Sequence, residues 1–280
     1  MPRHNPRRFL DVAVRAARRA GALLTHHLGR PLTIETKRSA IDLVTVVDRH
    51  SERILHEAIR RHFPDHGFHG EERLRTNPNS PYQWLVDPLD GTTNFVHGVP
   101  TFAISIGLLC DDELLVGVIY DPTRSEMFTA IKETGAWLNG KRIRVSRTRH
   151  IADSLLGTGF PPTFRDNPHR YLAWFEAFQS RCHAVRRIGS TALSLAYVAC
   201  GRQDGLYEEQ LWPWDIAAGI LLVEEAGGRV TDFHGRPIRR LEDGRIVASN
   251  GSLHNEMLAL LTNPPRRGSR QRDRLPRATR

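Results

Sequence analysis

The sequence predicts a layered α+β protein with two sheets, and two observations support this. A run of predicted strands fills residues 83–131, and from residue 146 onward strands and helices alternate. The 280 residues suffice for one large domain made of two packed halves. We expect a single domain over residues 1–263, with an α+β half to about 145 and an α/β half from about 146. Residues 264–280 have no apolar periodicity and predict a disordered, Arg-rich tail.

The first half is expected to open with two helices and to continue as an antiparallel meander. Residues 9–28 place apolar side chains on one helical face, and Gly29 and Pro31 end that helix. A second helix is expected over about 48–62, before Pro64. Strands are predicted at residues 83–86, 102–109, 114–120 and 126–131, followed by a hairpin turn at Asn139-Gly140.

In the second half, predicted strands alternate with predicted helices. Helices are predicted at about 168–181, 190–200, 213–226 and 254–261. Strands are predicted at residues 155–160, 185–188, 205–208, 229–232 and 246–248. This order favours a second sheet covered by helices.

The net charge of +9 is located at the two ends of the chain. Residues 1–20 carry a net +5 and residues 264–280 a net +6, so the remaining residues carry −2. A basic surface typical of nucleic-acid binding is therefore confined to the ends. The body of the protein suits a carboxylate-rich site.

Cysteine usage and hydropathy predict a cytoplasmic protein without a membrane segment. Cys110, Cys182 and Cys200 are far apart and form no CxxC pair, as expected of free thiols in a reducing compartment. The longest apolar run, residues 102–110, is too short to cross a bilayer. The Arg-rich N-terminus lacks the apolar segment of a secretory signal.

The segment from Trp84 to Asn94, WLVDPLDGTTN, carries the sharpest chemical signal. An apolar strand leads to Asp87 and Asp90, and Pro88 favours a type I turn that places both carboxylates on one side. Two carboxylates and a backbone carbonyl are ligands that a hard cation such as Mg²⁺ prefers. The following Gly91 allows close backbone approach, and Thr92 and Thr93 can begin a short helix, whose first amides attract anions. A solvated acidic turn is the alternative interpretation of a DxxD pair alone.

Further carboxylates support a metal-assisted phosphate chemistry. Glu71 and Glu72 follow Gly70 in a loop before the strand that ends at Asp87. Asp215 begins an apolar helix, where an acidic residue also complements the helix dipole. Metal ligands beside a phosphate-binding turn are typical of metal-dependent phosphoester hydrolysis.

The chain resembles the inositol monophosphatase family, and most of all its bacterial inositol-1-monophosphatase members. The resemblance covers about residues 9–262. Its elements are DLVTVVD at 42–48, GEE at 70–72, DPLDGTTN at 87–94, the segment 186–192, and WD at 214–215 through EAGG at 225–228. It implies a layered αβαβα sandwich of the inositol monophosphatase and sugar phosphatase type, a homodimer, and Mg²⁺-dependent, Li⁺-sensitive hydrolysis of phosphate monoesters.

The resemblance also implies residue roles. Glu71, Asp87 and the Leu89 carbonyl would hold a first, water-activating Mg²⁺. A second Mg²⁺ would be bound by Asp87, Asp90 and Asp215, and a third, weaker one would share Glu71, giving two to three per active site. Asp48 and Thr92 would orient the attacking water, and the Gly91 and Thr92 amides would bind phosphate.

On the substrate side, the resemblance implies that Asp90, the Gly189-Ser190-Thr191 segment and Glu208 meet a polyol. A carboxylate such as Glu208 accepts hydrogen bonds from paired hydroxyls, although a solvated strand end is a competing interpretation. Arg186 matches a family position near the dimer and pocket, and a structural role is preferred for it. Lys37 could close a loop over the phosphate, or be a solvated surface residue.

These observations predict hydrolysis of small polyol phosphates, most of all myo-inositol monophosphate. Histidinol phosphate, fructose 1,6-bisphosphate and 3′-phosphoadenosine 5′-phosphate remain open as substrates. A regulatory protein associated with RNA or RNA polymerase is the alternative from another class. Its support is the seven Arg of residues 264–280, which could bind phosphates in a salt-dependent way.

Overall fold

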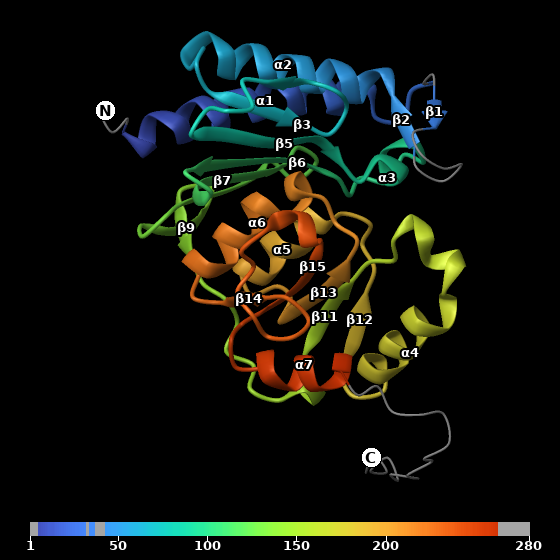
Figure 1. Cartoon of the computed structure of the whole chain (residues 1–280). Coiled ribbons are helices and arrows are strands. Elements are labelled where there is room, and N and C mark those ends of the chain that lie inside the picture. The colour runs from blue at the N-terminus through green and yellow to red at the C-terminus, as the bar shows by residue number, and fades with distance from the viewer. Residues whose placement is uncertain (1–4, 32–33, 37–42, 263–280) are drawn as a thin grey trace.

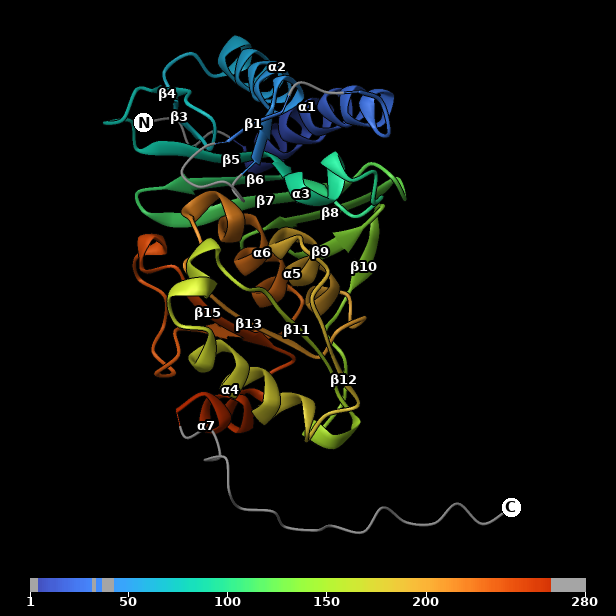
Figure 2. The same cartoon turned by 90° about the vertical axis from the view of Figure 1, so that its right-hand side faces the viewer.

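The computed structural model describes residues 5–31, 34–36 and 43–262, and these residues form five stacked layers (Figure 1). A pair of helices covers the outer face of an eight-stranded sheet, and a second pair separates that sheet from a five-stranded sheet. A third pair covers the far face of the five-stranded sheet (Figure 2). The αβαβα sandwich that the sequence predicts is confirmed.

The first layers are built by the first half of the chain. The outer helices are α1 (Pro6–His27) and α2 (Val46–His62), which follows the β1–β2 hairpin (Ile34–Thr36, Leu43–Thr45). The large sheet has the order β10-β9-β8-β7-β6-β5-β3-β4. Its strands are β3 (Gly67–Gly70), β4 (Arg75–Thr76), β5 (Tyr82–Asp90), β6 (Ala103–Cys110), β7 (Glu113–Asp121), β8 (Glu126–Ile131), β9 (Gly135–Leu138) and β10 (Lys141–Ile143). Short helix α3 (Thr92–Val96) joins β5 to β6.

The second half forms the smaller sheet, of order β12-β11-β13-β15-β14. Its strands are β11 (Leu155–Thr158), β12 (Ala184–Arg186), β13 (Gly205–Glu209), β14 (Arg229–Thr231) and β15 (Arg245–Ser249). Helices α5 (Thr191–Ala199) and α6 (Pro213–Glu225) lie between the sheets, and α4 (Pro168–Gln179) and α7 (His254–Thr262) lie outside. Three short 3-10 turns complete the half, at Ile151–Asp153, Pro162–Asp166 and Leu241–Asp243.

Each pair of neighbouring layers encloses an apolar core. Phe9 of α1 and Trp84 of β5 are fully buried between the outer helices and the large sheet. Leu195 and Ile220 fill the space between the sheets, and Phe178 packs below the small sheet. None of the helices in the described part of the chain is both long enough and apolar enough to cross a membrane.

Two local expectations differ from the structure. The predicted strand at 83–86 continues to Asp90 in place of a type I turn, and the register against β6 shifts between Asp87 and Asp90. This irregularity accommodates the extra residue within the sheet, as a β-bulge does. Strands β1 to β4 were not predicted: each has only two to four residues, and β3 includes Gly67 and Gly70. The predicted disordered tail, residues 264–280, lies outside the described residues.

Candidate active site

Helix α2 begins with a hydrogen-bond network that joins Asp48 to Thr92. Thr45 is the N-cap, and its amide donates to Asp48 Oδ2 at 2.8 Å in a capping box. The other oxygen, Asp48 Oδ1, lies 3.1 Å from the Thr92 hydroxyl. The Thr92 hydroxyl is also 3.1 Å from the Leu89 carbonyl oxygen. The two residues expected to orient water are therefore adjacent, although 44 positions separate them.

The irregular end of β5 carries Asp87, Leu89 and Asp90. The Asp87 side chain accepts the Leu89 amide at 2.9 Å, so the carboxylate folds back onto its own strand. Ser51 of α2 donates to the Pro88 carbonyl oxygen at 2.8 Å and fixes the middle of the segment. Asp87 is 3% exposed, so this carboxylate faces the interior of the site.

Glu71 lies in a loop that a second carboxylate of α2 holds in place. The side chain of Glu52 is 2% exposed and accepts the amides of Glu72 at 2.8 Å and Leu74 at 3.3 Å. A Cβ at Gly70 would lie 2.0 Å from Glu52 Oε1, so glycine permits this close approach. Glu52 was not predicted as a site residue, because a glutamate in an amphipathic helix usually indicates a solvated face.

Asp215 enters the site from the first turn of α6. The Ser105 hydroxyl of β6 donates to the Trp214 carbonyl oxygen at 3.0 Å, and Asp215 itself accepts the Trp212 amide at 2.7 Å. Helix α6 approaches the large sheet closely, since a Cβ at Gly107 would lie 2.7 Å from Ala217 Cβ. These contacts bring Asp215 next to the end of β5.

A loop from the second half completes the site. Asp90 Oδ2 accepts the Ser190 hydroxyl at 2.6 Å and the Ala192 amide at 2.7 Å. Thr191, between them, donates its hydroxyl to Glu208 Oε2 at 2.8 Å. The structure thus brings Asp90, the 189–191 segment and Glu208 together.

The carboxylates at the site have perturbed pKa values. Loss of hydration raises the pKa of Asp87 well above its ordinary value, and the negative charges of Glu71, Asp90 and Asp215 add to the effect. The pKa of Asp215 is raised in the same way. Loss of hydration also raises the pKa of Asp90 to about 6 and that of Glu208 to about 7, despite their hydrogen bonds. Clustered carboxylates of this kind favour protonation or a cation.

A cavity of about 250 Å³ opens beside these groups. Of the predicted residues, it is lined by Glu71, Asp90, Gly189, Ser190, Thr191, Glu208 and Asp215. Asp48, Asp87 and Leu89 are buried behind this surface. The volume suits a small molecule.

Arg187, Phe160 and Trp212 are among the wall residues that were not predicted as substrate contacts. Arg187 lines the cavity, whereas its neighbour Arg186 is not among the lining residues. The Arg187 guanidinium lies 5.6 Å from the ring centroid of Phe160, a cation–π arrangement. Trp212 is 46% exposed and stacks on Trp214. Lys37 lies outside the described residues.

The donor set suits a hard cation in its chemistry. Carboxylates and carbonyl oxygens at this end of β5 are the ligand type that Mg²⁺ prefers. Within the described ranges, no three acidic, histidine or cysteine side chains already form a closed metal-binding group. Glu71, Asp87, Asp90 and Asp215 nevertheless influence one another electrostatically. The carboxylates therefore fit a metal by type and proximity, and would have to adjust to enclose one.

Comparison with known proteins identifies the family and supports the fold. Residues 5–264 match the model of the inositol monophosphatase family. A protein from Pseudomonas aeruginosa named Nus factor SuhB is 44% identical over 261 residues, which is 90% of this chain and 95% of that protein. The inositol monophosphatase structure from Anabaena is 43% identical, with a TM-score of 0.84 over 92% of this chain and 97% of that one. The extragenic suppressor protein SuhB from Bartonella henselae gives 39% identity and a TM-score of 0.86, over 92% and 99%.

Proposed function

The chain belongs to the inositol monophosphatase family, and on that premise we propose that it is a Mg²⁺-dependent phosphatase of small polyol phosphate monoesters. Its preferred substrate is myo-inositol monophosphate, and the products are inositol and phosphate. Histidinol phosphate and fructose 1,6-bisphosphate are the alternative substrates. The active form is a homodimer in the cytoplasm, and Li⁺ inhibits it.

One observation carries this proposal. Asp87 and Asp90 of β5 and Asp215 of α6 lie close to one another and to Glu71 beside a cavity, and these charges raise the pKa of Asp87 and Asp215. A structural core gains nothing from such mutual repulsion, because unpaired buried charge is unfavourable. Perturbed carboxylates at a cavity are typical of functional sites.

Glu71, Asp87, Asp90, Asp215 and the Leu89 carbonyl would hold two to three Mg²⁺ ions. Bound divalent cations supply Lewis acidity, which makes water more acidic and stabilises negative charge on a departing oxygen. Asp90 already uses Oδ2 for Ser190 and Ala192, so Oδ1 is its available ligand atom.

The protein's own groups then bind and orient the reactants. The Thr92 hydroxyl donates to Asp48 Oδ1 at 3.1 Å, so this pair would orient the attacking water and pass one of its protons to the Asp48 carboxylate. The Gly91 and Thr92 amides precede the first helical hydrogen bond of α3, from the Phe95 amide to the Gly91 carbonyl oxygen, and bind phosphate oxygens. No covalent intermediate is required.

The polyol part of the substrate is met by Glu208 and the 189–191 segment. Thr191 occupies one carboxylate oxygen of Glu208, so the other remains to accept a substrate hydroxyl. Arg187, at the cavity wall, contributes positive charge near Glu208. This side of the cavity selects the leaving group.

Phosphate release tests the proposal directly. Wild-type protein with Mg²⁺ is offered inositol 1-phosphate, histidinol phosphate, fructose 1,6-bisphosphate and 3′-phosphoadenosine 5′-phosphate, with and without Li⁺. We expect the highest kcat/KM for inositol 1-phosphate, and loss of activity in Asp90→Asn. The matched control is Asp111→Asn, an exposed aspartate in the turn at the opposite end of β6. Full activity of Asp90→Asn would overturn the site assignment.

A second function is favoured by the relatives themselves. Several proteins 42–44% identical to this chain are named Nus factor SuhB, and residues 264–280 contain seven Arg. We propose that the chain also associates with RNA or RNA polymerase through this basic segment. RNA affinity of the full chain and of residues 1–263 is compared at two salt concentrations. Equal, weak binding by both would contradict the role of the tail.

A further inference from the structure

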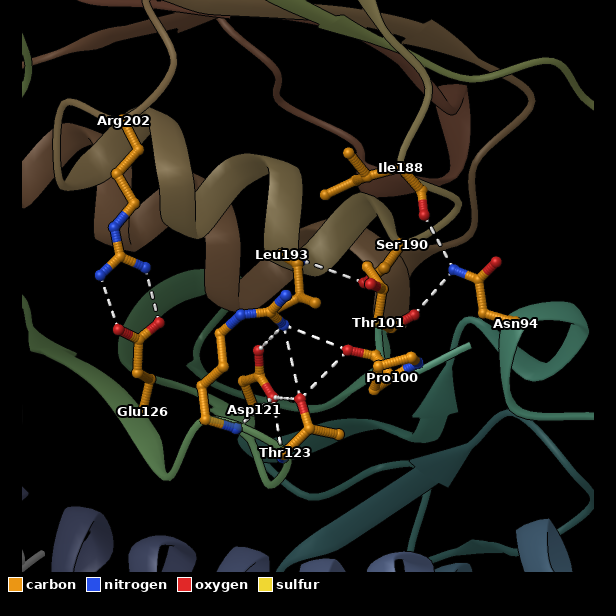
Figure 3. Close-up of polar contacts among 11 residues, drawn as sticks. Asn94, Pro100, Thr101, Asp121, Thr123, Glu126, Ile188, Ser190, Leu193 and Arg202 are labelled. Carbon is orange, nitrogen blue, oxygen red and sulfur yellow. Dashed lines mark hydrogen bonds and ion pairs between the residues drawn. The ribbon is translucent and has the colours of Figure 1, made fainter. Parts of the chain in front are cut away.

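Asn94, in the first turn of α3, bridges the two halves of the protein beside the site. Its Nδ2 donates to the Thr101 carbonyl oxygen at 2.7 Å and to the Ile188 carbonyl oxygen at 2.8 Å. Figure 3 shows the Asn94 amide pointing between these two carbonyls. Thr101 precedes β6 of the large sheet, whereas Ile188 follows β12 of the small sheet. One neutral side chain therefore connects segments from both sheets.

Two glycines allow the backbones to meet here. Gly189 has a φ of +80°, and a Cβ there would lie 2.9 Å from Asn94 Nδ2. A Cβ at Gly91 would lie 3.2 Å from the Gly189 carbonyl oxygen. The start of α3 and the 188–189 segment are thus in direct contact, with no room for a side chain between them.

The anchor on the Thr101 side is itself rigidly held. Thr123 Oγ1 donates to the Pro100 carbonyl oxygen at 3.1 Å, and Arg124 Nη1 lies 3.2 Å from the same atom. Both residues are also bound to Asp121, which is fully buried (Figure 3). Asn94 therefore ties the 188–192 loop to a fixed point on the large sheet.

The loop has a second attachment of a different kind. Asp90 accepts the Ser190 hydroxyl and the Ala192 amide, so it holds the end of the 188–192 loop, where α5 begins. Under the proposed function, Asp90 also serves a cation. The hydrogen bonds of Asn94 come from a neutral amide and do not depend on that charge. Thr191, whose hydroxyl donates to Glu208, lies between the two residues that Asp90 holds.

We propose that Asn94 is a positioning residue that determines specificity for the polyol group of the substrate. It fixes the 188–192 loop against the phosphate end of the cavity, so that Thr191 and Glu208 stand at the correct distance from the phosphoryl group. The proposal rests on the proposed function, because it concerns the leaving-group side of that same site. A phosphate monoester without hydroxyls does not use this side of the cavity, and depends less on the loop.

Two substrates and two variants test the proposal. Asn94→Asp replaces the donor by a carboxylate facing two carbonyl oxygens, and Asn94→Ala removes it. For inositol 1-phosphate we expect kcat/KM to fall by at least about tenfold, mainly through KM, and for p-nitrophenyl phosphate by less than about threefold. The control is Asn139→Asp, because Asn139 Nδ2 donates to the Ser125 carbonyl oxygen in a hairpin of the large sheet. In Asn139→Asp, kcat/KM for either substrate should fall by no more than about twofold.

Hydrogen exchange supplies a readout that does not need activity. In the Asn94 variants, the amides of Ala192 and Leu193, which bond to Asp90 and Ser190, should exchange faster. Amides of β7 should be unchanged, which also reports an intact fold. Unchanged exchange at Ala192 and Leu193, or an equal loss of kcat/KM for both substrates, would overturn the positioning role. Wild-type protein that hydrolyses neither substrate would contradict the proposed function, and the exchange data would still test whether Asn94 holds the loop.

Discussion

Two groups of buried or half-buried carboxylates in this protein differ in what surrounds them. Asp121 and Glu209 each meet a guanidinium, Arg124 at 2.9 Å and Arg170 at 2.6 Å. Asp87, Asp90, Asp215 and Glu208 form no ion pair with a basic side chain in the described part of the chain, and their pKa values are raised. Within one fold, acidic side chains are thus neutralised in one region and crowded in another.

This difference indicates two roles. A carboxylate that is paired and accepts several hydrogen bonds, as Asp121 does, supports structure (Figure 3). A group of carboxylates that repel one another is poised to receive positive charge or donors from outside the protein. We therefore expect substitutions in the first set to affect stability and those in the second to affect ligand binding and activity.

The largest expected effect is that of Asp87→Asn on activity. Asp87 lies at the centre of the acidic group, and loss of a metal-binding carboxylate removes several kcal/mol of charge stabilisation, so phosphate release should fall on the order of a thousandfold. Without metal, the variant should be at least as stable to urea as wild type, because a repulsive charge is gone. If Asp87→Asn were active, or unfolded at a much lower urea concentration than wild type, the two sets of carboxylates would not differ in role as proposed.

Asp121→Asn should give the opposite result. The fully buried Asp121 accepts the amides of Thr123 and Arg124 and pairs with a half-exposed arginine. Weakening this network should lower the free energy of unfolding by about 3 kcal/mol. Urea denaturation measures this, and the kcat of the protein that remains folded should stay within about threefold of wild type. Wild-type stability would show that Asp121 is not structural.

The raised pKa of Glu208 should make the stability of the metal-free protein depend on pH. Its pKa is about 7 in the folded protein and ordinarily 4.5, so between these values the unfolded chain has lost a proton that the folded protein keeps. Stability therefore falls as pH rises through this window, by about 3 kcal/mol at most. In metal-free Glu208→Gln, this part of the change between pH 4.5 and pH 8 should be absent from denaturation curves. Identical curves for variant and wild type would contradict the raised pKa.

Glu52→Gln should have a smaller effect, on the metal requirement. The Glu72 and Leu74 amides donate to different oxygens of Glu52, and in Gln one of these becomes an NH₂ donor, so the loop carrying Glu71 loosens. The Mg²⁺ concentration for half-maximal activity should rise by about tenfold or more. Glu57→Gln, on the exposed face of α2, is the matched control and should leave it unchanged. If Glu52→Gln and Glu57→Gln needed the same Mg²⁺ concentration, Glu52 would not position the loop that carries Glu71.

The sequence predicted the features that local patterns encode. The layers follow from apolar periodicity, and Asp87 and Asp90 stand out because an apolar strand and a glycine flank them. Asp215 was recognisable only through the family resemblance, since an acidic residue in a first helical turn has an ordinary explanation. The site itself is assembled by contacts distant in sequence.

The missed residues bind backbone groups rather than one another. Glu52 accepts amides 20 and 22 positions away, and Asn94 donates to a carbonyl 94 positions away. No side-chain motif marks such contacts, because any residue supplies the backbone partner. The sequence also does not show that Arg187 lines the cavity and Arg186 does not, because this depends on the direction of the chain after β12.

Whether Asp87, Asp90 and Asp215 form a cation site can be measured by Mg²⁺ titration of the metal-free protein, by calorimetry at pH 6 in two buffers of different ionisation enthalpy. Since the pKa of Asp90 is about 6 and those of Asp87 and Asp215 are raised, cation binding should displace protons. The account predicts binding with release of about one proton or more, abolished in Asp87→Asn and retained in Asp121→Asn. The cation site would be contradicted if Mg²⁺ did not bind. It would also be contradicted if Mg²⁺ bound without releasing protons and bound equally well to Asp87→Asn.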